Sequence, residues 1–153
     1  LYVIRRGLEM IVVEEAVAKA TPEQIAQMRR VLQEYRELLL SGSGEEQQAV
    51  DHHVLFHQLM TRSTGNRVLM DFLDPITVFR IPCSWGLSSP PTPDRDAYEL
   101  YIRGHEKIVD AIERRDVEAA KTAMLEHLAD LAERARRATE ELQRSQETRL
   151  PLT

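Results

Sequence analysis

The sequence predicts an all-α protein, an antiparallel bundle of about six to seven helices. Apolar residues recur every three or four positions along most of the 153 residues, which is the spacing of one face of a helix. The stretches between these patterns are short and rich in Gly, Ser, Asn and Pro, as turns between antiparallel helices are. No segment alternates between apolar and polar residues in the manner of a half-buried strand.

The first predicted helix covers residues 1–20 and is apolar on two sides. Its apolar positions form two rows: Leu1, Ile4, Leu8, Ile11 and Val12, and then Val3, Met10, Val13 and Val17. A helix of this kind is buried on both sides, either in the core or against a partner chain. The second case would make the helix an interface for a homodimer.

The second helix has a start signal at Thr21. The run Thr21-Pro22-Glu23-Gln24 is a capping box, in which the Thr and Gln side chains bind each other's backbone N–H groups, and Pro suits the first helical position. Apolar residues continue at helical spacing, and two glycines within residues 41–44 end the helix.

Two further helices are expected before the middle of the chain. The third covers about residues 45–62 and ends at a Gly-Asn terminator. The fourth covers about residues 66–81, and Pro75 is expected to kink it. Residues 83–94 contain three prolines and a glycine, which predicts an exposed loop.

The last two helices complete one domain. Thr92-Pro93 caps a fifth helix that continues to about residue 115, and Asp116 caps a sixth. The apolar stripe of the sixth helix fades after about residue 141. We therefore expect a single domain over residues 1–142 and a frayed tail over residues 143–153.

The composition excludes several function classes. Lys and Arg number 20 against 25 for Asp and Glu, a formal net charge of −5, whereas a free-standing nucleic-acid binder carries an excess of basic residues. The single cysteine, Cys83, excludes an internal disulfide and a Cys-rich zinc site. No apolar run is long enough to cross a membrane and no signal peptide opens the chain. We expect a cytoplasmic protein without a membrane partner.

Four of the five histidines fall on the inward faces of three predicted helices. His53 and His57 lie about 40° apart on the third helix, whereas His105 and His127 take apolar positions in the fifth and the sixth. Burying several imidazoles is costly unless each has a partner, and one divalent cation would partner all of them. His52 lies on a different face and is expected to stay outside this group.

The expected ligand set is rich in nitrogen. Neutral imidazoles suit zinc, nickel, copper or iron, and the scarcity of oxygen argues against calcium and magnesium. Four nitrogen ligands leave room for a small molecule that carries a carboxylate. The alternative is that each histidine is a hydrogen-bonded core residue and binds no metal.

Signatures of catalysis are missing from the sequence. Position 54 is Val, so the pair His53 and His57 lacks the Glu of a His-Glu-x-x-His protease. No Glu stands three residues before His57, His105 or His127, as it does in di-iron bundles. The chain has no Gly-rich phosphate loop and no nucleophile elbow. We therefore expect that it is not an enzyme.

Three segments, in order, resemble a known family. Residues 5–9 are similar to the motif R-x-x-L-E, residues 56–66 to F-H-x-x-L followed by G-N, and residues 104–128 to H-x-x-I-x-x-A-I followed by M-x-x-H-L. These motifs are typical of the ligand-binding (FCD) domain of FadR-type transcriptional regulators in the GntR family. The resemblance extends from Arg5 to Leu128 and so covers most of the chain.

The resemblance implies an all-helical effector domain that dimerises and, in many members, holds a divalent metal. The family's ligands are an Asp and a His four residues apart and two later histidines. They carry over as His53, His57, His105 and His127, with His53 in place of the Asp. This replacement makes the site all-nitrogen, which favours zinc or nickel over manganese. It also leaves the cation less neutralised, so an anionic effector should bind more strongly.

Arg5, Arg80 and Asn66 are candidate contacts for a small carboxylate effector. Both arginines follow apolar helix faces, and an arginine drawn toward a core needs a carboxylate to meet its charge. Arg5 could instead pair with Glu9 one turn on. Asn66 could instead cap the fourth helix.

Regulators of this family carry an N-terminal winged-helix DNA-binding domain, and no such domain precedes Leu1. Because the chain also starts without Met, we read it as a fragment that would meet DNA only through the missing domain. Two alternatives stay open. One is a metal-dependent hydrolase, which needs a carboxylate base beside the histidines, and the other is a metal-free helical dimerisation module.

Overall fold

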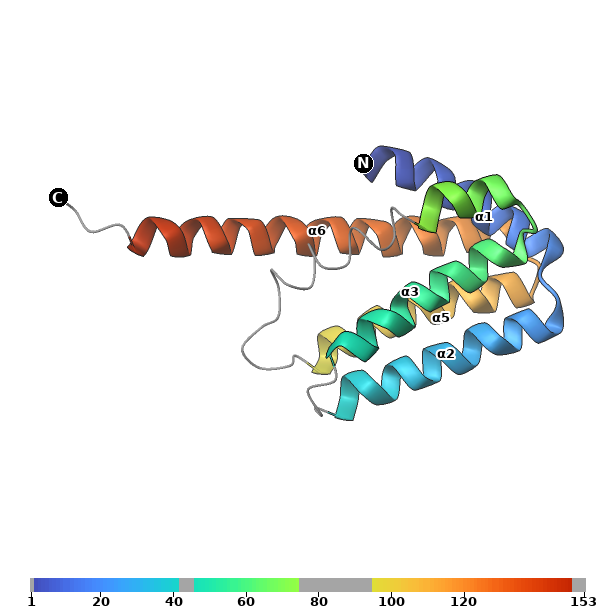
Figure 1. Cartoon of the computed structure of the whole chain (residues 1–153), viewed down its shortest axis with the longest axis horizontal. Coiled ribbons are helices and arrows are strands. Elements are labelled where there is room, and N and C mark those ends of the chain that lie inside the picture. The colour runs from blue at the N-terminus through green and yellow to red at the C-terminus, as the bar shows by residue number, and fades with distance from the viewer. Residues whose placement is uncertain (1, 42–45, 75–94, 150–153) are drawn as a thin grey trace.

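The computed structural model describes residues 2–41, 46–74 and 95–149 (Figure 1). Five long helices occupy these ranges: α1 (Tyr2–Lys19), α2 (Pro22–Ser41), α3 (Glu46–Ser63), α5 (Arg95–Glu113) and α6 (Val117–Arg149). Residues 67–74 are also helical, and the described ranges contain no strand. The predicted all-α fold is confirmed.

The helices pack as an antiparallel bundle. α2 packs against α3 and α5, α5 also packs against α6, and α1 contacts α3, α5 and α6. In Figure 1 the C-terminal half of α6 extends past the ends of the other helices. Ion pairs join α2 to α5: Arg29 contacts Asp110 at 2.9 Å and also Glu113, and Arg36 contacts Glu106 at 2.8 Å.

One core connects these helices. It is built from fully buried apolar side chains on each of them, including Val12, Val13 and Ala16 from α1, Met28 from α2, Phe56 and Met60 from α3, Ile108 and Ile112 from α5, and Ala120 and Met124 from α6. An outer apolar row of α1 remains exposed: Val3, Ile4 and Ile11 are 79%, 61% and 48% accessible. It takes residues from both predicted rows, and the core buries Val12 of the first row and Val13 and Val17 of the second.

Three predicted helix signals are confirmed: the capping box at Thr21, the glycine after α3 and the cap at Asp116. The backbone N–H of Gln24 donates to Thr21 Oγ1 at 3.3 Å, and that of Thr21 donates to Gln24 Oε1 at 2.9 Å, which is the reciprocal capping box. Gly65 ends α3 with φ of 68°, a left-handed conformation that favours glycine. The backbone N–H of Ala119 donates to Asp116 Oδ1 at 3.0 Å, so Asp116 caps α6.

The turn between α5 and α6 holds the end of α1. Arg115 has φ of 58°, a left-handed conformation on a residue other than glycine. Its guanidinium donates to the carbonyl oxygens of Val17 and Ala20, both at 2.7 Å. These are carbonyls at the C-terminal end of α1, which have no partner within their own helix. Arg115 therefore fastens the C-terminal end of α1 to the turn between α5 and α6.

Some predicted features differ from the structure, and others lie outside the residues that it describes. α6 continues to Arg149, beyond the predicted end near residue 141, so the described part of the predicted tail is helical. The kink at Pro75, the proline-rich loop over residues 83–94, Arg80 and Cys83 lie outside the described residues. Among the helices that the structure describes, none is both long and apolar enough to cross a membrane.

Candidate metal centre

Four buried histidines from three helices meet inside the bundle. His53 and His57 project from α3, His105 from α5 and His127 from α6, and none is more than 2% exposed. The prediction that these four side chains face the core is confirmed. His52 lies apart, with Nδ1 2.8 Å from the carbonyl oxygen of Gln48 and Nε2 3.2 Å from a carboxylate oxygen of Glu34.

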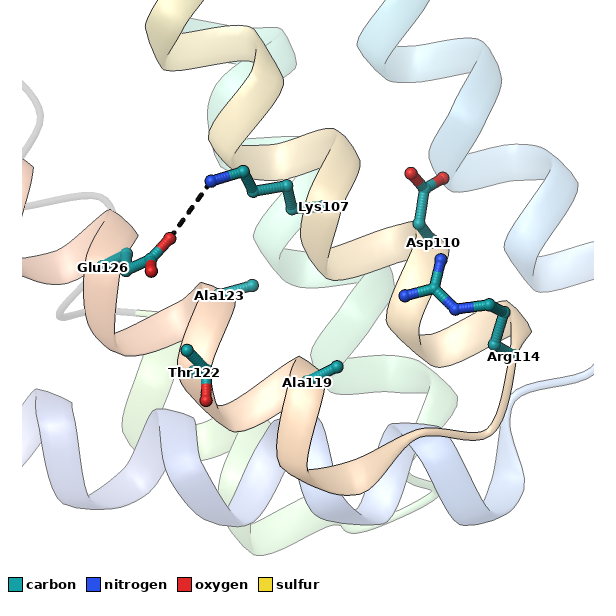
Figure 2. A pocket seen from close by; sticks show the side chains of 7 residues that line it. All are labelled: Lys107, Asp110, Arg114, Ala119, Thr122, Ala123 and Glu126. Carbon is teal, nitrogen blue, oxygen red and sulfur yellow. Dashed lines mark hydrogen bonds and ion pairs between the residues drawn. The ribbon is translucent and has the colours of Figure 1, made fainter.

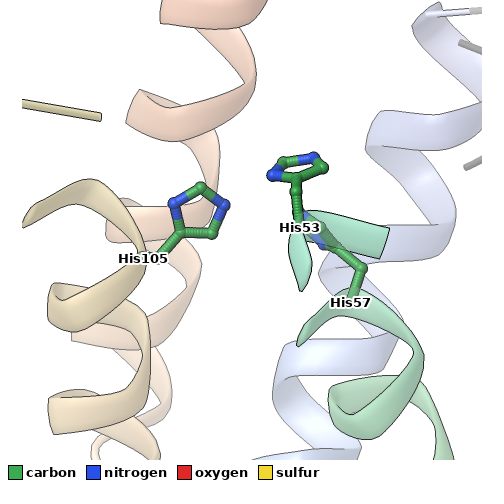
Figure 3. A group of neighbouring side chains, drawn as sticks. All are labelled: His53, His57 and His105. Carbon is green, nitrogen blue, oxygen red and sulfur yellow. The ribbon is translucent and has the colours of Figure 1, made fainter. Parts of the chain in front are cut away.

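The four rings lie in mutual contact. The ring centroids of His53 and His57 are 4.8 Å apart, those of His53 and His105 5.1 Å, and those of His105 and His127 4.2 Å. One ligand atom from each of His53, His57 and His105 lies within 4.8 Å of the other two (Figure 3). Bonds from zinc to nitrogen are about 2.0–2.1 Å long, so three nitrogens this close need only small side-chain movements to share one ion.

Two aromatic side chains enclose the histidines. The Tyr35 ring centroid from α2 lies 6.1 Å from that of His53 and 6.2 Å from that of His105. The Phe56 ring lies 5.4 Å from His57 and 5.0 Å from His105. Both aromatic residues are fully buried, so they keep water from the imidazoles. No local pattern in the sequence indicates that Tyr35 contacts this group.

A buried ion pair on α1 adjoins the histidines. Arg5 Nε donates to Glu9 Oε1 at 3.2 Å, and both side chains are at most 3% exposed. The same Glu9 oxygen lies 3.7 Å from His57 Nδ1. The pairing of Arg5 with Glu9 was one of the two expected roles of Arg5. The proximity of Glu9 to His57 was not predicted, because α1 and α3 meet only in the folded chain.

Several polar atoms of this group remain unsatisfied. Within the described residues, Arg5 Nη2, Glu9 Oε2 and both ring nitrogens of His57 are buried without a hydrogen-bond partner. Such atoms cost roughly 1–3 kcal/mol each when they are buried alone. A bound cation would give an imidazole nitrogen a partner. A bound anion would give the guanidinium of Arg5 one.

The surroundings keep the rings in the form that binds metal. Burial lowers the pKa of His53 and of His57 well below the usual histidine value, and the charges of neighbouring histidines and of Arg5 lower both further. Burial raises the pKa of the Glu9 carboxyl, while Arg5 acts in the opposite direction. A metal needs a neutral imidazole, so the donor set fits a divalent cation that accepts nitrogen ligands.

The three residues predicted to contact an effector have different positions. Arg5 lies beside the histidines, as described above. Asn66 caps the helix over residues 67–74, since its Oδ1 accepts from the backbone N–H groups of Val68 at 3.0 Å and Leu69 at 3.3 Å. That was its alternative role. Arg80 lies outside the described residues.

A separate hollow lies on the surface between α5 and α6. Its volume is about 440 Å³, and Figure 2 shows the seven residues that line it: Lys107, Asp110, Arg114, Ala119, Thr122, Ala123 and Glu126. An ion pair between Lys107 and Glu126, at 3.2 Å, crosses it. None of the four buried histidines lines this hollow, so it is distinct from the candidate metal centre.

The chain is similar to known transcriptional regulators. The family model of the FCD domain matches residues 1–130. The Uxu operon transcriptional regulator of Escherichia coli K12 is 30% identical over 138 residues, which are 85% of this chain and 50% of that protein. The transcriptional repressor RspR of the same strain is 29% identical over 141 residues, 90% of this chain and 58% of the repressor.

The fold is also similar to a solved structure. E. coli McbR/YncC superposes with a TM-score of 0.76 at 19% identity, over 88% of this chain and 65% of that one. Because the two sequences are only 19% identical, this comparison shows that the two chains share a fold and no more. The chain spans about half the length of the curated relatives it matches.

Proposed function

The chain belongs to the FCD domain family, and from that premise we propose that it is the effector-sensing, dimerising domain of a bacterial transcriptional regulator. Its relatives are named as regulators and repressors, and none of the names describes an enzyme. The observation that carries the proposal is the meeting of four buried imidazoles from three helices. A cation there would hold the helices of the bundle in one arrangement.

The proposed cofactor is a divalent metal held by His53, His57, His105 and His127. Three of these offer ligand atoms within 4.8 Å of one another, and His127 packs against His105 at a centroid distance of 4.2 Å. Imidazole ligands without a carboxylate favour zinc or nickel over manganese. The metal would supply a Lewis-acidic position in which a small molecule can be bound.

The proposed effector is a small carboxylate metabolite. Arg5 supports this choice, because its Nη2 is a buried donor without a partner in the described part of the chain. A guanidinium binds carboxylate oxygens with strong charge-assisted hydrogen bonds. Arg80 and Asn66 remain candidate contacts on the strength of the sequence. A metal site with no carboxylate ligand should also attract an anion.

The remaining partners are a second copy of the chain and, indirectly, DNA. The exposed apolar row on α1 supports a homodimer. With a net charge of −5, the chain itself is a poor match for DNA, so contact with DNA is assigned to a winged-helix domain outside this chain. A regulator of this kind acts in the cytoplasm.

The metal centre can be tested by elemental analysis of protein reconstituted with zinc or nickel and freed of excess ion. Wild-type protein should retain stoichiometric metal, and His57→Ala and His105→Ala should not, because each removes a ligand. His52→Gln is the matched control, since His52 lies outside the cluster, and it should retain the metal. Native mass spectrometry of the same samples reports any co-purified carboxylate.

Two results would contradict the proposal. Wild-type protein without stoichiometric metal after reconstitution would exclude the metal centre and favour the metal-free dimerisation module. Metal retained equally by all variants would place the ion elsewhere. The hydrolase alternative needs a free carboxylate base, and the carboxylate nearest the cluster, Glu9, is already engaged by Arg5.

A further inference from the structure

We propose that Glu9 is the positioning residue of the metal centre. Its carboxylate accepts a hydrogen bond from Nδ1–H of His57, leaves Nε2 of that ring to bind the metal, and supplies a negative charge that four imidazoles lack. This inference rests on the proposed metal centre and assigns a role in it to a residue of α1.

The geometry places Glu9 behind His57 rather than among the ligands. Its Oε1 is 3.7 Å from His57 Nδ1, about 0.9 Å beyond an ordinary charge-assisted hydrogen bond. The donor group whose atoms lie within 4.8 Å of one another contains His53, His57 and His105 and does not include Glu9. A ring that ligates a metal through one nitrogen commonly donates its other N–H to a carboxylate. Glu9 is positioned to be that carboxylate.

Because Glu9 is buried, its contact with His57 matters for the stability of the site. Glu9 is 1% exposed, and within the described residues its Oε2 has no hydrogen-bond partner. A carboxylate held out of water needs an opposite charge or a donor for each oxygen. Arg5 meets Oε1 alone. His57 Nδ1 lies 3.7 Å from that same oxygen, so an N–H fixed there by metal binding at Nε2 would give the buried carboxylate a second donor.

The balance of charge at the site also supports a role for Glu9. Four neutral imidazoles leave a divalent cation with its full charge, and the Arg5 guanidinium adds another positive charge nearby. Glu9, on a different helix, supplies beside His57 the negative charge that the four imidazoles lack. It also links the metal centre to α1, so occupancy of the site should influence how α1 packs on α3.

The test compares the zinc affinities of variants that each remove one partner of the Arg5–Glu9 ion pair. The affinities are measured by competition with a chromophoric chelator. Glu9→Gln should weaken zinc binding by about 10-fold or more, the usual loss for a carboxylate behind a ligating histidine. Arg5→Met breaks the same ion pair but keeps the carboxylate and removes a cation, so zinc should bind no more weakly than in the wild type. Glu15→Gln breaks the exposed Glu15–Lys19 pair of α1 and should change nothing.

The double variant Arg5→Met with Glu9→Gln guards against a folding defect, because it leaves no unpaired charge in the core. It should again bind zinc about 10-fold more weakly than Arg5→Met alone. In zinc-loaded wild type, the ¹⁵N shifts of the His57 ring should show protonated Nδ1 and metal-bound Nε2.

The outcomes are distinguishable. Equal losses in Glu9→Gln and Arg5→Met, or no loss on adding Glu9→Gln to Arg5→Met, would overturn the positioning role and leave Glu9 as a structural partner of Arg5. Metal bound to Nδ1 of His57 would overturn it as well. Wild-type protein that binds no zinc would instead overturn the proposed function from which this inference starts.

Discussion

His53 and His57 carry two titratable rings that water does not reach. Burial is the main reason that their pKa values lie well below the ordinary value of 6.5, and nearby positive charges contribute. In the unfolded chain the same rings take up protons near pH 6.5, whereas the folded chain keeps them neutral. As the pH falls below 6.5, the unfolded state therefore binds more protons, and the free energy of unfolding decreases.

This linkage gives a prediction for the metal-free protein. Between pH 7 and pH 5.5 the free energy of unfolding should fall by about 1 kcal/mol for each histidine that stays neutral in the folded state. Urea titrations at a series of pH values measure it. The variant with both His53→Gln and His57→Gln should show a clearly shallower dependence over that range. If the double variant shows the same pH dependence as the wild type, these two rings do not control how the free energy of unfolding varies with pH.

The residues of the candidate site were predictable to different degrees. The positions of His53, His57, His105 and His127 follow from the period of the helix, which fixes the face that each side chain occupies. The role of Glu9 beside His57 does not follow from any local period. It depends on how α1 lies against α3, and only the packed bundle shows it.

At the scale of the elements, the boundaries of the helices were largely predictable because their signals are local. The capping box at Thr21, the glycine after α3 and the cap at Asp116 all act within one turn of their own helix. The end of α6 was less predictable, because an apolar stripe that fades does not by itself stop a helix. Charged pairs such as Arg136 with Glu133 continue along its polar surface.

The fastening of α1 by Arg115 predicts a measurable effect on stability. Arg115→Ala should lower the free energy of unfolding by about 1–2 kcal/mol, because two hydrogen bonds from a charged donor are lost. Arg115→Gly should cost less, since glycine adopts φ of 58° without the steric penalty of a side chain. Thermal or urea unfolding of the metal-free proteins checks both values.

The neighbouring Arg114 provides the control for this contact. It is exposed and lines the surface hollow between α5 and α6, so Arg114→Ala should stay within about 0.5 kcal/mol of the wild type. If Arg115→Ala were equally neutral, the bonds to the carbonyls of Val17 and Ala20 would contribute nothing to stability.

At the scale of the whole molecule, the fold class was predictable because nearly every segment carries the same 3.6-residue period, and the turns between helices are short. The order in which the helices pack was not. Which helices are neighbours depends on the fit of whole faces, and a bundle allows several arrangements with the same periodic pattern. The exposed apolar positions of α1, Val3, Ile4 and Ile11, are the part of that pattern which the single chain leaves uncovered.

Ile4 and Ile11 are seven residues apart, so they lie on one face of α1, with the half-buried Leu8 between them. The buried Arg5 and Glu9 lie on a different face, so substitutions in this outer row leave the ion pair in place. An exposed apolar stripe of this kind is typical of a surface that a partner covers. The homodimer proposed above would bury it against the same stripe of a second copy.

Replacing both isoleucines with Glu should therefore convert the dimer into a monomer. Each Ile is worth about 1.5–3 kcal/mol when it is fully buried, and four introduced carboxylates would face one another across the interface. The dissociation constant should rise at least about 100-fold, which corresponds to roughly 2.8 kcal/mol. Sedimentation equilibrium measures this change directly. Ala26→Glu, on the exposed face of α2, adds a charge elsewhere and should leave the dimer intact. A double variant that stays dimeric would move the interface away from α1, and a monomeric wild type would exclude the homodimer for this chain.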